Sequence, residues 1–169
     1  MVKVEHMVLD SSYIRMITKM ISECDPLQFV ETDTPERLQE FIDRGMVLGL
    51  FVEGDLIAYA ALSIRTELQD LFSKYNVKTN RNVWEDAILL STCVVKDTYR
   101  GYGLQKRLIE LREIVARDSG YKEVFTSVNA RNIYSINNLI KTGYKQIGKH
   151  YIGNEWLLYG KSLTSTDTI

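Results

Sequence analysis

Histidine, cysteine and proline are scarce in this chain, whose 169 residues include two of each. The cysteines, Cys24 and Cys93, and the histidines, His6 and His150, are too few to supply the clustered ligands of a structural zinc site. We therefore expect no metal, and each cysteine is expected to pack as a small, buried, reduced side chain. A chain of this length can build a stable core without disulfides.

The sequence also lacks a surplus of charge and a long apolar run. Lysine and arginine number 21 against 22 aspartates and glutamates, so the net charge of -1 provides no positive field for nucleic acid. The longest apolar region, residues 46–62, is interrupted by Glu53-Gly54-Asp55 and falls short of the ~18 apolar residues of a membrane span. No apolar stretch of signal-peptide length follows Met1. These absences favour a cytoplasmic protein with neither nucleic acid nor membrane as its partner.

In the N-terminal part, the pattern of apolar residues predicts a strand over 2–8, two helices and a hairpin. The first helix follows the capping residues at 10–12, and the second starts at Thr34-Pro35 and ends at Gly45 in a left-handed conformation. Strands 47–52 and 56–64 form the hairpin around Glu53-Gly54-Asp55.

The C-terminal part alternates strands and helices, which is typical of an α/β fold. Residues 66–82 are polar and predict at most one helical turn, around Leu68 and Phe72. A strand that is thirty residues downstream of another, across a helix, is expected to run parallel to it. The expected elements are strand 84–95, helix 104–119, strand 124–128, helix 132–142, and strands 144–149 and 156–161 around a turn at 153–154. We expect one domain over 1–161, followed by a flexible tail, 162–169.

The segment from Val95 to Gln105 joins a buried strand to an amphipathic helix through two glycines. Gly101 and Gly103 let the backbone approach a ligand closely, and a helix N-terminus favours an anion such as pyrophosphate. Positive charge is concentrated here in Lys96, Arg100, Lys106 and Arg107. A plain structural turn explains two glycines equally well, and neither a Walker nor a Rossmann string is present.

Two motifs resemble the GNAT N-acetyltransferases. The string Arg100 to Gln105 is similar to the family's acetyl-CoA loop, Gln/Arg-x-x-Gly-x-Gly/Ala, with Gln105 departing from the final Gly/Ala. Asn132, Ser135 and Gly143-Tyr144 resemble its Asn-x-x-Ala/Ser segment, which a Gly-Phe/Tyr pair follows. The resemblance extends loosely over residues 47–161.

This resemblance implies a mixed sheet of six or seven strands with helices on both faces. A central parallel pair, 91–95 and 124–128, would splay apart to admit pantetheine. The acetyl-CoA-binding residues that it implies are Cys93, Val94, Val95, Arg100, Gly101, Tyr102, Gly103, Leu104, Gln105, Asn132, Ser135 and Asn138. For Asn132, a role as helix N-cap is an equal alternative.

The implied activity is transfer of an acetyl group from acetyl-CoA, the cosubstrate, to a primary amine by direct attack. No acyl-enzyme is needed, so Cys93 is interpreted as a packing or backbone contact. Many family members carry a tyrosine acid at the position of Leu139. Tyr134 is therefore considered for proton transfer, and so is Glu85, which strand alternation places on the face of Ser91 and Cys93. A solvated residue at a strand end is the alternative for Glu85.

Other functions stay open. A non-catalytic acyl-CoA sensor or interaction module of the same fold would tolerate Leu139 and Gln105. A toxin that acetylates aminoacyl-tRNA would need a basic cleft, against which the net charge argues. The amine acceptor is not identified, and its site is expected to be lined by the first two helices, residues 66–82 and the turn 151–156. Family members often dimerise, and a homodimer through the C-terminal strands is an expectation of the same kind.

Overall fold

The computed structural model describes residues 3–24, 33–63, 66–78 and 83–164. The chain divides into two compact units, of which the first comprises residues 1–63 and 91–108 and the second residues 64–90 and 109–169. In the described residues, seven strands form one mixed sheet, in the order β1 (Glu5–Leu9), β2 (Met46–Val52), β3 (Asp55–Ser63), β4 (Ala87–Val95), β5 (Glu123–Asn129), β7 (Asn154–Ser162) and β6 (Lys145–Ile152). In the described ranges, no helix is long and apolar enough to cross a membrane.

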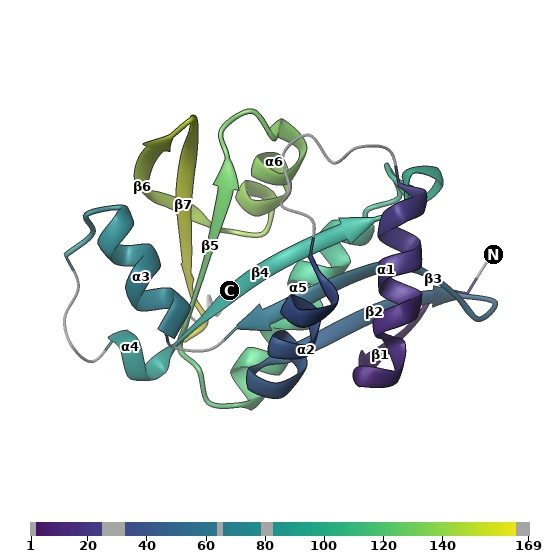
Figure 1. Ribbon diagram of the computed structural model, residues 1–169. Coiled ribbons are helices and arrows are strands. Elements are labelled where there is room, and N and C mark those ends of the chain that lie inside the picture. The colour runs from purple at the N-terminus through teal and green to yellow at the C-terminus, as the bar shows by residue number, and fades with distance from the viewer. Residues whose placement is uncertain (1–2, 25–32, 64–65, 79–82, 165–169) are drawn as a thin grey trace, which may run out of the picture. The chain divides into compact units, whose positions relative to one another are not determined.

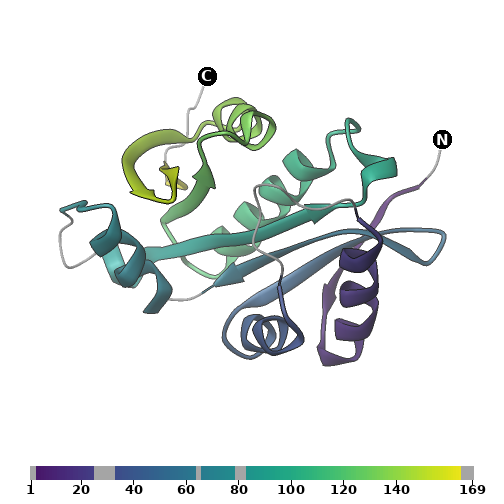
Figure 2. The same ribbon diagram turned by 45° about the horizontal axis from the view of Figure 1, so that its top comes forward.

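The first unit contains three antiparallel strands, the end of β4 and two helices that pack on the strands. Its elements are β1 (Glu5–Leu9), α1 (Ile14–Glu23), α2 (Pro35–Arg44), β2 (Met46–Val52), β3 (Asp55–Ser63), the C-terminal part of β4 (Ala87–Val95) and the start of α5 (Leu104–Asp118). Figures 1 and 2 show α1 and α2 lying side by side on one face of β2 and β3. This arrangement buries the apolar stripe of each helix against the strands.

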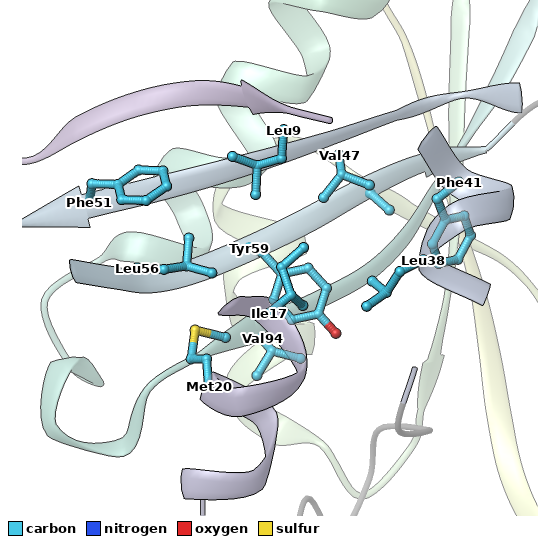
Figure 3. Packing of buried hydrophobic residues seen from close by; sticks show 11 residues of the cluster. Leu9, Ile17, Met20, Leu38, Phe41, Val47, Phe51, Leu56, Tyr59 and Val94 are labelled. Atoms are coloured by element: carbon cyan, nitrogen blue, oxygen red, sulfur yellow. The ribbon is translucent and has the colours of Figure 1, made fainter. Parts of the chain in front are cut away.

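The core of the first unit lies between these helices and strands (Figure 3). Ile17 and Leu38 point from α1 and α2 toward Tyr59 on β3, and all three are almost inaccessible to solvent. Val94 of β4 belongs to the same cluster. The cluster therefore fixes the strand that leads into the glycine-containing loop.

Local sequence determines where the helices and the hairpin of this unit begin and end. The Asp10 carboxylate accepts a 2.8 Å hydrogen bond from the Ser12 N–H and caps the 3-10 turn Ser11–Tyr13, which leads into α1. The Thr34 hydroxyl accepts one of 3.2 Å from the Arg37 N–H and caps α2. Glu53 and Gly54 adopt positive φ angles of 51° and 87° at the predicted hairpin turn. The predicted start of the second helix and the hairpin are confirmed, whereas the first α-helix begins at Ile14, after the 3-10 turn.

The conformation predicted for Gly45 is wrong. Its φ is -150°, which is not left-handed. A Cβ at this position would lie 2.0 Å from the Leu62 carbonyl oxygen. Glycine is needed here because two backbone segments approach closely, and such an approach between residues far apart in the chain leaves no local pattern.

The second unit contains the start of β4, the rest of α5 and the C-terminal elements. These are α3 (Thr66–Lys74), the short α4 (Val83–Asp86), β5 (Glu123–Asn129), α6 (Ile133–Lys141), β6 (Lys145–Ile152) and β7 (Asn154–Ser162). The parallel β4–β5 ladder pairs Ala87–Leu89 with Glu123–Phe125, which confirms the predicted parallel pair. β5 and β6 both pair antiparallel with β7.

The core of the second unit forms between α3 and the strands. Phe72 contacts Phe125 of β5 edge to face, with ring centroids 4.8 Å apart, and Leu68 and Leu158 belong to the same cluster. Residues 66–82, for which the sequence predicts at most one helical turn, therefore contain the nine-residue helix α3, and this helix buries its few apolar residues. Its polar composition is that of a helix whose other side faces solvent.

Two further boundaries differ from the prediction. β4 starts at Ala87, because residues 83–86 form the helical turn α4. The predicted tail starts too early, since β7 continues to Ser162 and Leu163 is only 7% exposed. The rest of that tail, residues 165–169, lies outside the described residues.

Candidate functional site

The loop between β4 and α5 lies within the first unit and has the geometry of an open turn. After the 3-10 turn Asp97–Tyr99, Gly101 and Gly103 adopt left-handed φ angles of 85° and 76°, and α5 starts at Leu104. A Cβ at either glycine would meet no atom within 4 Å. Glycine is therefore required by backbone conformation, and the space in front of the loop is open.

The first backbone N–H groups of α5 lie next to this loop and precede the hydrogen bonding of the helix. Helical hydrogen bonding begins with the Arg107 N–H, which donates to the Gly103 carbonyl over 3.0 Å. The N–H groups that precede it lie at the positive end of the helix dipole. Leu104 is 7% exposed and anchors the helix start, whereas Tyr102 is 78% exposed. This arrangement can bind an anion through the backbone.

The basic side chains of the loop are not all directed at a ligand. Arg100 pairs with the Asp97 carboxylate at 2.5 Å and donates through Nε to the Val95 carbonyl at 3.3 Å. Lys96 lies 3.5 Å from the Glu23 carboxylate. Arg100 therefore braces the loop, and less positive charge is available to a ligand than the sequence indicates.

Arg107, a further basic residue near the loop, also bonds to the protein, donating to the Val4 carbonyl at 3.0 Å. Among the β4 candidates for acetyl-CoA binding, Val94 is buried in the core, so only its backbone can reach a ligand. Cys93 is half-buried and not in a disulfide. The Val95 carbonyl, expected to bind pantetheine, already accepts the hydrogen bond from Arg100.

The second motif lies in the second unit, at the start of α6. The Asn132 side-chain oxygen accepts a 3.2 Å hydrogen bond from the Ser135 N–H, so Asn132 is the helix N-cap. Asn132, Ser135 and Asn138 are all half-buried. Gly143 ends the helix with a φ of 92°, and Tyr144 is buried beneath it. Asn132 therefore caps α6, as one of the two alternatives for it predicted, and this role leaves its side-chain amide group able to contact a ligand as well.

The two candidates for proton transfer are both exposed. Glu85 lies in α4 and not on β4, which corrects the strand face assigned to it. The correction arises because residues 83–86 form a helical turn whose Asp86 pairs with Lys122 at 2.9 Å. The Tyr134 side chain is 86% exposed on α6, whereas Leu139, on the same helix, is buried.

Polar groups that sequence reasoning missed come from residues far apart in the chain. In the first unit, the buried Tyr59 hydroxyl donates a 2.7 Å hydrogen bond to the Asp33 carboxylate. Burial, followed by the nearby Asp33 charge, raises the pKa of Tyr59 well above its ordinary value. In the second unit, Tyr75 and Ser127 share a 2.5 Å hydrogen bond. No spacing in the sequence could identify either pair.

Buried charge is a further missed feature of the second unit. Lys161 donates a 2.7 Å hydrogen bond to Glu113, whose side chain is 7% exposed. Burial, followed by the Glu113 charge, raises the pKa of Tyr144. In the part of the chain that is described, no three His, Cys, Asp or Glu side chains group as metal ligands.

Solved structures similar to this chain are acetyltransferases. A GNAT-family acetyltransferase from Streptococcus pneumoniae matches with a TM-score of 0.73 and 16% identity, over 95% of this chain and 99% of its own. The ribosomal-protein-S18-alanine N-acetyltransferase of Escherichia coli matches with a TM-score of 0.76 and 11% identity, over 99% of each chain. A putative acetyltransferase from Salmonella typhimurium, solved with its cofactor acetyl-CoA, matches with a TM-score of 0.72 and 14% identity, over 98% of this chain and 99% of its own.

At these identities the structures show a shared fold. No curated protein matches the chain. The model of the acetyltransferase (GNAT) family matches residues 14–144, which include the glycine loop and the motif that begins at Asn132. This match covers most of the chain, and the mixed sheet with its β4–β5 parallel pair agrees with it. The chain therefore belongs to the acetyltransferase (GNAT) family.

Proposed function

We propose that this protein transfers the acetyl group of acetyl-CoA to a primary amine. The observation that carries the proposal is the loop before α5, where Gly101 and Gly103 hold left-handed conformations with open space in front of them. A loop of this kind at a helix N-terminus binds pyrophosphate through backbone N–H groups. Membership of the acetyltransferase (GNAT) family and a similar structure solved with acetyl-CoA support the same ligand.

Backbone and side chains have different roles in this proposal. The N–H groups from Gly101 to Gln105 bind the pyrophosphate, because the Arg100 N–H already donates to the Asp97 carbonyl at 3.2 Å. The Arg100 guanidinium holds the loop through the Asp97 carboxylate and the Val95 carbonyl. The backbone around Cys93 and Val94 receives pantetheine. Tyr102 is exposed beside the glycines and can contact the nucleotide end of the cosubstrate. The net charge of the chain matters little, because the fixed dipoles of the loop act over short distances.

In the second unit, Asn132, Ser135 and Asn138 are the proposed acetyl-CoA contacts. The Asn132 oxygen caps α6, but its amide group retains N–H donors for a ligand. All three side chains are half-buried rather than fully exposed, as suits residues that line a binding surface. The similar structure solved with acetyl-CoA covers nearly the whole chain, including this helix.

The chemistry that this chain can supply is placement and polarisation. A neutral amine attacks the thioester carbonyl directly, and backbone N–H groups that face the carbonyl oxygen stabilise the charge that develops there. No acyl-enzyme is required, so Cys93 serves as a strand contact. Glu85 and Tyr134 are both exposed, so either would exchange a proton with the reaction through water.

The test measures thiol release from acetyl-CoA in the presence of a panel of amines, which includes amino acids, a polyamine, an aminoglycoside and a peptide N-terminus. An alanine amide and a peptide with N-terminal alanine belong in the panel, because one protein of this fold is the ribosomal-protein-S18-alanine N-acetyltransferase of Escherichia coli. We expect turnover with at least one member. Tight binding of acetyl-CoA without turnover on any amine would contradict the proposal and favour a non-catalytic acyl-CoA sensor.

A further inference from the structure

The strand β6 of the second unit forms one edge of the sheet. Among the described strands it pairs only with β7 and is the last in the sheet order (Figure 1). In the described ranges, no backbone group outside the sheet forms a hydrogen bond with residues 145–152. Alternate N–H and C=O groups of an edge strand point away from its neighbour, and they can pair with an added strand.

A bulge limits the length of this edge. The register between β6 and β7 shifts between Gln146 and Gly148, and from Gly148 to Ile152 the pairing is regular. A bulge bends the strand and interrupts pairing with an added strand. The edge available to a partner is therefore residues 148–152.

The regular segment has a basic face and an apolar face. The register with β7 places Lys149 and Tyr151 on one face and His150 and Ile152 on the other. Lys149 is exposed, and the exposed fractions of Tyr151 and Ile152 are 73% and 63%. Neighbouring exposed apolar side chains mark sites of interaction, and tyrosine is enriched at such sites.

The end of α3 supports the apolar face of this segment. A Cβ at Gly148 would lie 3.1 Å from the half-buried Val77, and the ring of His150 packs against Tyr75 with the centroids 5.6 Å apart. Tyr75 belongs to the core of the second unit. These contacts hold the strand in place, so a partner meets a preformed edge and pays little to order it.

Positive charge is concentrated around this edge. Residues 124–164 contain five lysines and arginines but only one acidic residue, Glu155. Lys145 and Lys149 lie on β6 itself, and in the described part of the chain neither forms an ion pair. Two copies of β6 would bring like charges together, which disfavours pairing of the strand with itself. The complementary partner is therefore acidic.

We propose that the edge at residues 148–152 binds an extended segment of another protein in which acidic and apolar residues alternate. The segment adds to the sheet as a strand, and its backbone pairs with the outward N–H and C=O groups of β6. Its carboxylates lie on the face of Lys149 and Tyr151 and accept hydrogen bonds from the ammonium and the phenol. Its apolar side chains lie on the face of Ile152 and Val77. None of the proposed acetyl-CoA contacts takes part, so this binding is independent of acetyl transfer.

Isothermal titration calorimetry at about 0.15 M salt tests the charge requirement with two short capped peptides. One alternates glutamate and valine, and the other alternates lysine and valine. We expect the wild type to bind only the glutamate–valine peptide. Lys149→Glu should weaken this binding by about tenfold or more and should allow the lysine–valine peptide to bind.

Lys145→Glu is the matched control, because it makes the same charge change on the same strand. Lys145 lies before the bulge and on the opposite face from Lys149. Salt screens its charge from the bound segment, so both affinities should stay within about twofold of the wild type. Similar affinities of the wild type for the two peptides, no binding of the glutamate–valine peptide, or equal effects of the two substitutions would overturn the proposal.

Backbone pairing is tested with two methylated forms of the glutamate–valine peptide, one N-methylated at the glutamates and the other at the valines. Only one of these alternating sets of N–H groups faces β6 in an added strand, so one form should lose binding and the other should keep it. Binding by both forms would overturn the proposal. So would a dimer in sedimentation that Ile152→Asp dissociates, which would assign the edge to a second copy, or tighter binding of oligouridylate, which would assign it to RNA.

Discussion

At the scale of single residues, the two kinds of glycine in this chain make different demands. Gly45 has an ordinary φ, but a Cβ would lie 2.0 Å from the Leu62 carbonyl oxygen. Gly54 has open space around it and a left-handed φ of 87°. The first glycine is required by packing and the second by backbone conformation.

Gly45→Ala should therefore lower the free energy of unfolding by about 3 kcal/mol, because the backbone must move to admit a methyl group. Gly54→Ala should cost only about 1–2 kcal/mol, and Gly54→Asn less, because asparagine tolerates the left-handed region. Urea unfolding measures all three. Similar losses of stability for Gly45→Ala and Gly54→Ala would contradict this distinction. The absence of any loss for Gly45→Ala would contradict it as well.

The salt bridge between Glu113 and Lys161 holds a charge that is almost fully buried. The Glu113 carboxylate is held by Lys161 at 2.7 Å, and its second oxygen, Oε1, has no hydrogen-bond partner among the described residues. Lys161→Met should lower the free energy of unfolding by about 3 kcal/mol, because it leaves this carboxylate buried and unpaired. Adding Glu113→Gln should recover part of the loss. A cost below about 0.5 kcal/mol for Lys161→Met in urea unfolding would contradict this prediction, because it would show that water solvates the Glu113 carboxylate.

At the scale of elements, α6 combines a structural and a proposed binding role in its first residue. Asn132→Ala removes the cap and should destabilise the protein by about 1 kcal/mol, while Asn132→Ser keeps a capping oxygen and should cost little. If Asn132 also contacts acetyl-CoA, both variants should weaken acetyl-CoA binding in calorimetry. Normal affinity in both variants would restrict Asn132 to capping.

Sequence patterns predicted the elements whose signals are local. The Thr34-Pro35 start, the Glu53-Gly54 turn and the glycine loop before α5 each depend on residues within a few positions of one another, and each is present. The helix α3 was underestimated, because only its side toward the core is apolar.

Long-range contacts were beyond such patterns. The Tyr75–Ser127 bond joins residues 52 positions apart, and the charged residues Arg112 and Glu113 are buried on α5, which the sequence indicates only as an amphipathic helix. In the candidate site, the loop and the α6 cap could be predicted from motifs. The pairing of Arg100 with Asp97, which decides what the arginine does, could not.

At the scale of the whole molecule, buried tyrosines in both units link stability to alkaline pH. Burial raises the pKa of Tyr59 and of Tyr144 above the ordinary value of 10.0. Above about pH 10 the unfolded chain loses these protons and the folded chain keeps them, so the folded state binds more protons and stability falls as pH rises.

Each such tyrosine should lower the free energy of unfolding by about 1.4 kcal/mol per pH unit above 10. Tyr59→Phe should make the decline between pH 10 and 11 shallower by about 1 kcal/mol, since the unfolded tyrosine is still half protonated at pH 10, whatever its effect at pH 8. Urea unfolding at pH 8, 10 and 11 measures both slopes. Identical slopes in the wild type and in Tyr59→Phe would mean that this tyrosine ionises alike in both states.

The central claim is that the loop before α5 binds acetyl-CoA, and isothermal titration calorimetry with a pair of glycine variants tests it most directly. Gly103 and Gly120 both have left-handed φ angles, 76° and 86°, with no atom within 4 Å of an added Cβ. Glutamate at either position brings the same strain and charge, but only Gly103→Glu places them at the proposed pyrophosphate site. The account predicts that the wild type and Gly120→Glu bind acetyl-CoA, while Gly103→Glu stays folded and loses the binding. Equal affinity in the two variants, or no binding by the wild type, would contradict it.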